Sequence, residues 1–123
     1  MGNYEGYRKR SCRIINWWLE DEPEEKKKEV WYVYLLLEKA TKDLKADPIG
    51  VLHDLVWDND IFNIEQVEKL AEDRERLKEV VSRCPKRQKI FIKSHFEAIL
   101  KAVEIHKNLS NENKSLLKEL GYC

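Results

Sequence analysis

The most apolar stretch of the sequence reads VWYVYLLL and covers Val30–Leu37. It stands in a chain of 123 residues of which 37% are charged. These eight residues are too few to cross a bilayer, because a membrane-spanning helix needs about 20 apolar residues. They are also too apolar to form a water-exposed helix surface. We therefore expect the rest of the chain, a second copy or a partner to cover this segment on nearly all sides.

The spacing around the apolar stretch favours a helix over a β-strand. Val, Trp and Tyr are common in strands, so a strand is the alternative. The flanks, however, are rich in Lys and Glu, which favour helices. Helical spacing also links the apolar positions Val30, Val33, Leu37, Ala40 and Leu44. The sequence thus predicts one long helix over about residues 24–46.

Helical periodicity continues on both sides of this segment. We expect further helices over about residues 4–19, 48–57, 64–83 and 86–108, and a short last helix capped by Ser110. The pairs Asp47-Pro48 and Asn63-Gln66 are typical of helix starts. Only 4 Gly and 3 Pro are present, and no linker separates the segments. The prediction is an all-α, single-domain (1–123) irregular bundle of about five to six helices, with the 24–46 helix at its centre.

Charge is segregated along the chain although it sums to zero. The 23 basic and 23 acidic residues create no global field that would attract nucleic acid or an anionic membrane. Residues 54–79 carry nine acidic and four basic side chains, whereas residues 80–107 carry seven basic and two acidic ones. The simplest explanation is that the helices of these two segments are antiparallel neighbours whose charges pair.

The cysteines and the N-terminus bear on the compartment. Cys12, Cys84 and Cys123 are odd in number and far apart, and no Cys-x-x-Cys motif occurs. This pattern argues against zinc knuckles and thioredoxin-type redox motifs. The N-terminal segment is polar and basic, unlike a signal peptide. Three reduced thiols and a cytoplasmic location are therefore expected.

Candidate catalytic and metal-binding patterns are incomplete. The segment from Asp58 resembles a calcium loop, but Phe62 and Lys69 stand where an EF-hand requires oxygen ligands. His95 and His106 return to nearly the same helix face, yet no full ligand set accompanies them. We predict that the chain is not an enzyme and that it holds no cofactor and no metal.

The aromatic content points to a binding function. The chain has 4 Trp and 5 Tyr, more than one small core needs, and Trp, Tyr and Arg commonly anchor protein interfaces. The leading prediction is a non-enzymatic protein-binding module: an inhibitor, immunity factor, adaptor or accessory subunit. It would act through an aromatic and basic helical surface anchored by Trp17, Trp31 and Tyr34. Trp31 or Tyr34 could also pack across the two-fold axis of a homodimer.

The alternative prediction is a nucleic-acid-binding accessory protein. Arg10, Arg13 and Trp17 share one side of a helix, with Arg8 beside them, so they could hold a phosphate backbone and stack a base. A second basic group opens the helix over 86–108 and consists of Lys86, Arg87, Lys89 and Lys93. Contacts of this kind would be salt-dependent and independent of sequence. Neither prediction involves a membrane or a small-molecule substrate.

Overall fold

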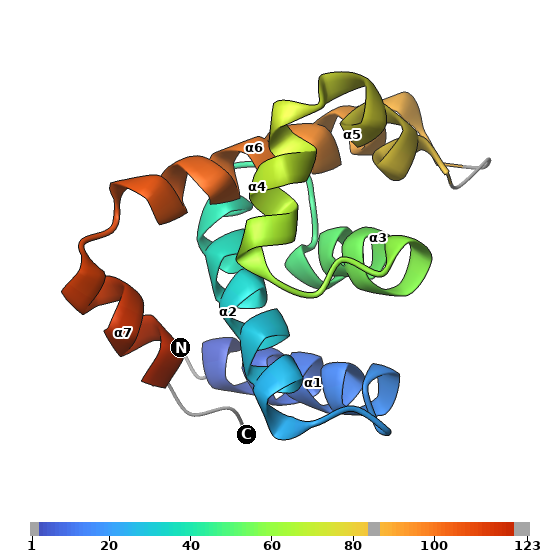
Figure 1. Cartoon of the computed structure of the whole chain (residues 1–123). Coiled ribbons are helices and arrows are strands. Elements are labelled where there is room, and N and C mark those ends of the chain that lie inside the picture. Colours follow the sequence, from blue (N-terminus) through green and yellow to red (C-terminus); the bar gives the residue numbers. More distant parts are fainter. Residues whose placement is uncertain (1–2, 84–86, 120–123) are drawn as a thin grey trace.

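The computed structural model describes residues 3–83 and 87–119 (Figure 1). These residues form seven helices and no strand, which confirms the all-α class. The count of five to six was too low. The helices are α1 (Asn3–Trp18), α2 (Glu24–Ala40), α3 (Pro48–Asn59), α4 (Ile64–Glu72), α5 (Arg74–Ser82), α6 (Lys89–Asn108) and α7 (Asn111–Glu119).

The apolar stretch lies in α2, and other helices of the same chain cover it. Each residue of Val30–Leu37 is at most 4% exposed. α2 packs against five other helices, namely α1, α3, α4, α6 and α7. Burying this segment removes its apolar side chains from water, which is the main favourable term in folding. A second copy or a partner is therefore not required to cover it.

Two helix boundaries differ from the prediction because polar side chains end the helices early. α2 stops at Ala40 and not near residue 46, since the Thr41 hydroxyl donates to the Leu37 carbonyl at 2.8 Å. The segment 64–83 is two helices, because Asp73 leaves helical geometry and its side chain accepts from the Arg76 amide at 3.1 Å. An aspartate in this position competes with the helix hydrogen bonds and starts a new helix.

Other expected helix ends are present. The Asp47 side chain accepts from the Ile49 amide at 3.1 Å, and the Asn63 side chain accepts from the Gln66 amide at 2.9 Å. Ser110 caps α7 by accepting from the Asn113 amide at 3.1 Å. α6 begins at Lys89 and not at residue 86, because Arg87 and Gln88 are not helical.

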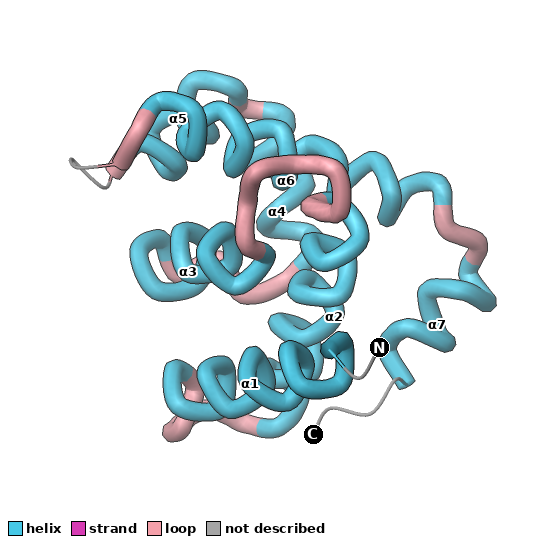
Figure 2. The backbone as a smooth tube through the Cα atoms, turned by 180° about the vertical axis from the view of Figure 1, so that it is seen from behind, coloured by secondary structure: helices cyan, strands magenta, loops and turns pink. Residues whose placement is uncertain are grey.

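The other helices are arranged around α2 on two sides and at one end. Figures 1 and 2 show α1, α3 and α5 one above another on one side of α2, and α7 on the other side. α6 crosses the end of α2 that is distant from α1. α6 packs on α4 and α5, as predicted from their charges. In the described part of the chain, the contact between oppositely chargeable side chains of these helices is His106 to Glu68 at 3.5 Å, which is an ion pair only when the imidazole is protonated, so apolar packing holds these helices together.

Two further findings concern membrane-spanning helices and the state of the cysteines. Across the described ranges, none of the helices combines the length and the apolar character that crossing a membrane requires. Cys12 is buried and disulfide-bonded, so the expectation of three reduced thiols is wrong. The other two cysteines, Cys84 and Cys123, lie outside the described residues.

Candidate functional site

Among the side chains whose burial the structure describes, the most exposed large aromatic ones meet where α1 and α3 end. Trp17 is 70% exposed and Trp57 is 55% exposed. Their rings stack with centroids 6.3 Å apart and an interplanar angle of 22°. Large apolar side chains are usually buried, so two exposed indoles in contact mark a candidate binding surface.

Two further rings fix the position of this pair. Trp18 is partly buried against the core and contacts His53 edge-to-face, with centroids 5.4 Å apart. His53 lies one turn before Trp57 on α3 and stacks on it at 6.2 Å. The four rings of Trp17, Trp18, His53 and Trp57 are called the indole surface below. Because each ring contacts another, they lose little conformational entropy when a partner binds.

The predicted grouping of Arg10, Arg13 and Trp17 on one side of a helix agrees with their exposure. All three side chains are exposed along α1. At the α3 side, the Nδ1 atom of His53 lies 3.6 Å from a carboxylate oxygen of Asp58. The indole surface thus has exposed arginines on one helix and a carboxylate on the other.

The other two predicted anchors lie in the core. Trp31 is 4% exposed and Tyr34 is 2% exposed, and their rings meet edge-to-face at 4.9 Å. The Tyr34 hydroxyl accepts a hydrogen bond from the Ser11 hydroxyl at 3.0 Å. Burial raises the pKa of the Tyr34 phenol. In this structure neither ring can reach a partner or a two-fold axis, because the apolar stretch that carries them is covered by the chain's own helices.

The seven described residues of the nucleic-acid alternative do not form one surface. Arg8 pairs with Glu38 at 2.7 Å, and Arg87 is used inside the fold, as described next. Lys86 lies outside the described residues. The exposed basic residues form two groups, Arg10 and Arg13 on α1 and Lys89 and Lys93 on α6. Figures 1 and 2 place these helices at opposite ends of α2, so the two groups are separate.

Arg87 belongs to a buried charge network. Its guanidinium donates to both carboxylate oxygens of Asp54, at 2.6 and 2.7 Å, and to the Val81 carbonyl at 2.8 Å. The Nδ1 atom of His95 lies 2.7 Å from Asp54 Oδ2. Asp54 is 1% exposed and His95 is 6% exposed. This network joins α3 to α6 and to the end of α5, and sequence reasoning missed it because its members are far apart in the chain.

One group of possible metal ligands involves the same carboxylate. Ligand atoms of His53, Asp54 and Asp58 lie within 4.8 Å of one another. Both oxygens of Asp54 already accept hydrogen bonds from Arg87, which balances its charge inside the protein. A metal there would compete with a buried bidentate ion pair. We therefore assign Asp54 to the fold and not to a metal centre.

No family model matches this sequence, and neither a curated protein nor a solved structure is significantly similar to it. The function is therefore argued from the surfaces of the chain itself. Among the sites predicted from the sequence, the surface around Trp17 is the one that combines exposure, ring stacking and neighbouring charge.

Proposed function

We propose that the chain is a non-enzymatic protein-binding module, such as an inhibitor, immunity factor, adaptor or accessory subunit. Its contact surface is the indole surface. The observation that carries this proposal is the exposure of two stacked indoles, Trp17 and Trp57, at 70% and 55%. Tryptophan is among the residues most often found at the energetic centre of protein interfaces.

The size of the surface supports a specific contact. Covering the exposed parts of the two rings would remove about 300 Å² of apolar surface from water, worth up to about 7 kcal/mol before the costs of association. Arg10 and Arg13 lie exposed on the same helix as Trp17. The partner that fits this surface has an apolar patch for the indoles and carboxylates beside it.

The test compares an indole variant with a matched control. Trp17→Ala combined with Trp57→Ala removes both exposed rings, whereas Leu116→Ala removes a 55% exposed apolar side chain from α7. Tagged wild-type and variant proteins are used to capture partners, which are quantified by mass spectrometry. A captured protein is then purified and its affinity for each form is measured by calorimetry.

The expected result is a partner that binds wild type and the Leu116 variant and loses at least about tenfold in affinity with the indole variant. Sedimentation of the isolated chain tests a second copy as the partner. A complex or dimer that keeps its affinity in the indole variant contradicts the proposal.

One observation favours nucleic-acid binding as a second candidate. Arg13 is exposed one helical turn from the exposed Trp17 ring, which would suit a phosphate beside a stacked base. Fluorescence anisotropy with labelled single-stranded RNA and duplex DNA, from about 50 to 200 mM salt, tests it. Binding that weakens steeply with salt and disappears in Arg10→Gln/Arg13→Gln supports it, and an absence of binding at low salt excludes it.

The cytoplasmic location predicted from the sequence stays a prediction. The disulfide at Cys12 is an argument against it, because disulfides persist mainly in oxidising compartments. The protein-binding proposal does not depend on the compartment.

A further inference from the structure

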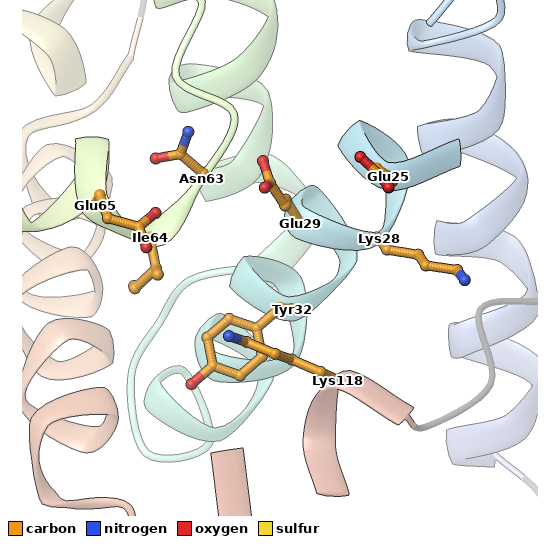
Figure 3. Close-up of a pocket in the computed structure, with 8 residues that line it drawn as sticks. All are labelled: Glu25, Lys28, Glu29, Tyr32, Asn63, Ile64, Glu65 and Lys118. Carbon is orange, nitrogen blue, oxygen red and sulfur yellow. The ribbon is translucent and has the colours of Figure 1, made fainter. Parts of the chain in front are cut away.

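A pocket of about 330 Å³ lies on the side of α2 that faces α7 (Figure 3). Its residues come from the first half of α2, the start of α4 and the end of α7. They are Glu25, Lys28, Glu29, Tyr32, Asn63, Ile64, Glu65 and Lys118. This volume is in the range of small-molecule sites. The pocket is called the Tyr32 pocket below.

Carboxylates surround the opening of the pocket. Glu25, Glu29 and Glu65 are all exposed. Among the described residues, none of the three is in an ion pair within 4.0 Å. Three carboxylates at one opening create a negative potential that attracts cations.

The floor of the pocket already holds a cation. The Nζ atom of Lys118 lies 5.2 Å from the centroid of the Tyr32 ring, and Figure 3 shows its side chain lying across that ring. An ammonium within about 6 Å of an aromatic ring face is attracted by the ring quadrupole. Lys118 therefore shows directly what kind of group this position accepts.

The Tyr32 ring is held in place from its far end. Its hydroxyl lies 2.7 Å from His106 Nδ1, and His106 Nε2 lies 3.5 Å from a carboxylate oxygen of Glu68. Burial raises the pKa of the Tyr32 phenol to about 12, so the hydroxyl keeps its proton while it is hydrogen-bonded to His106. The neutral ring accordingly presents its face to the pocket while its polar end is satisfied elsewhere.

The helix that supplies Lys118 is weakly anchored. α7 contains no buried residue, and it packs mainly on α2. Few buried apolar contacts mean a low cost of local opening. A ligand can therefore replace the Lys118 ammonium without disturbing the core.

We propose that the Tyr32 pocket binds an aliphatic primary ammonium group, carried by a free polyamine or by a lysine side chain, and that Lys118 occupies the ammonium position until the ligand displaces it. The carboxylates of Glu29 and Glu65 hold the cation or a second ammonium of the same ligand. This binding site is independent of the indole surface and does not depend on the proposed function.

The pocket predicts an order of affinity among ligands. A single partly exposed ion pair or cation–π contact contributes about 1 kcal/mol or less, so a monoamine binds weakly. A polyamine can place one ammonium on the ring and another among the carboxylates. Spermidine should therefore bind more tightly than a lysine analogue with one ammonium.

The experiment measures ligand binding to the full chain by calorimetry and by NMR of the His106 ring. The probes are spermidine, cadaverine and N-acetyl-lysine methylamide. Lys118→Gln removes the resident ammonium and should tighten binding by about fivefold. Lys45→Gln is the matched control, because it removes an exposed lysine between α2 and α3 that does not line the pocket.

Carboxylate variants complete the test. Glu29→Gln should weaken binding about fivefold, the loss expected for one partly exposed ion pair. Glu79→Gln on α5 removes an equal charge outside the pocket and should leave the affinity unchanged. Spermidine binding above that of the lysine analogue identifies a polyamine site, and the reverse order identifies a site for a lysine side chain.

Three results would overturn the proposal. One is the absence of heat and of His106 shifts with millimolar probes in both wild type and Lys118→Gln. Another is equal tightening by Lys118→Gln and Lys45→Gln, which would reflect net charge alone. The third is equal weakening by Glu29→Gln and Glu79→Gln. Circular dichroism confirms that each variant is folded, and all four substitutions are at exposed positions.

Discussion

Asp54 and Arg87, 33 positions apart in the sequence, form a bidentate ion pair inside the protein, with N–O distances of 2.6 and 2.7 Å. Asp54 is 1% exposed, and His95 adds a third polar contact at 2.7 Å. A buried carboxylate is tolerated when it is paired and its oxygens accept hydrogen bonds. The pair therefore ties α3 to the residues that lead into α6.

Removing one partner of this pair should destabilise the protein strongly. Asp54→Asn leaves the Arg87 charge without its carboxylate, and we expect the free energy of unfolding to fall by about 3–5 kcal/mol. Urea unfolding followed by circular dichroism measures this loss. Asp54→Leu combined with Arg87→Met should cost less than Asp54→Asn alone, because no charge is left buried.

The ion pair between Arg8 and Glu38 is the control, because the Arg8 side chain is 43% exposed. Arg8→Met should cost less than about 1 kcal/mol. Equal losses for Arg8→Met and Asp54→Asn would show that the buried network does not have the proposed role.

The contact between Tyr32 and His106 predicts a dependence of stability on pH at both ends of the scale. Burial lowers the pKa of the His106 imidazole, with Lys114 acting in the same direction and Glu68 against it. Below about pH 6.5 the unfolded chain binds a proton there that the folded chain does not. The contribution of His106 to the free energy of unfolding therefore falls as the pH drops below that value.

The Tyr32 phenol affects the free energy of unfolding at alkaline pH. Burial, and then Glu68 and Glu65, raise the Tyr32 pKa from 10.0 to about 12. As the pH rises above about 10, the unfolded chain ionises first, so the stability from this group is lost between pH 10 and 12. In Tyr32→Phe, the free energy of unfolding should fall less as the pH rises above 10. Tyr34 should still cause part of the fall, because its pKa is also raised.

NMR titration of the imidazole and absorbance titration of the phenols measure these shifts. A His106 pKa at or above 6.5 would contradict the predicted acid dependence. An alkaline stability profile that is the same in wild type and Tyr32→Phe would contradict the second prediction.

Asp60 predicts a stabilising substitution at the end of α3. Its φ is 54°, and in the described part of the chain it is the only residue other than glycine with a positive φ. Side chains are unfavourable in this left-handed conformation, whereas glycine is not. Asp60→Gly should raise the free energy of unfolding by about 1 kcal/mol and the Tm by about 3–6 °C. Asp60→Val should lower both, and a lower Tm for the glycine variant would contradict the argument.

The disulfide at Cys12 predicts a thiol count. The chain has 3 cysteines, so unfolding it without reductant should expose one free thiol per chain. Ellman's reagent in guanidinium measures this number. Cys12→Ser should lower the free energy of unfolding by about 2–5 kcal/mol, the range typical for the loss of a native disulfide. Three thiols in the unreduced protein would show that the bond does not form.

Local patterns were sufficient to predict most of the helices. The 3.6-residue spacing of apolar positions identified α1, α2, α3 and α6, because a helix that buries one face must repeat at that interval, and the Ser110 cap identified the start of α7. The predicted capping residues Asn63 and Ser110 were confirmed. Each accepts a hydrogen bond from an amide three residues further on, so its role depends on the local sequence. The break at Asp73 was missed, because its periodic flanks read equally well as one helix.

Which aromatic residues are exposed was decided by the tertiary structure. Trp17 and Trp31 were both predicted as interface anchors, yet one is 70% exposed and the other 4%. The difference arises because other helices cover residues 30–37 of α2, whereas the end of α1 contacts α3 through rings that remain at the surface. The predicted anchor at Trp17 therefore lies on a surface, and Trp57 was not predicted at all.

The sequence by itself determined that the chain is helical and that residues 30–37 must be buried, because helix periodicity and hydrophobicity are local properties. Only the tertiary structure decided which charges meet. Arg87 was assigned to a phosphate-binding face, but it pairs with Asp54, and Lys118 lies over Tyr32. Electrostatic and ring contacts depend on distances in space, and residues far apart in the chain reach those distances once the apolar core has placed their helices.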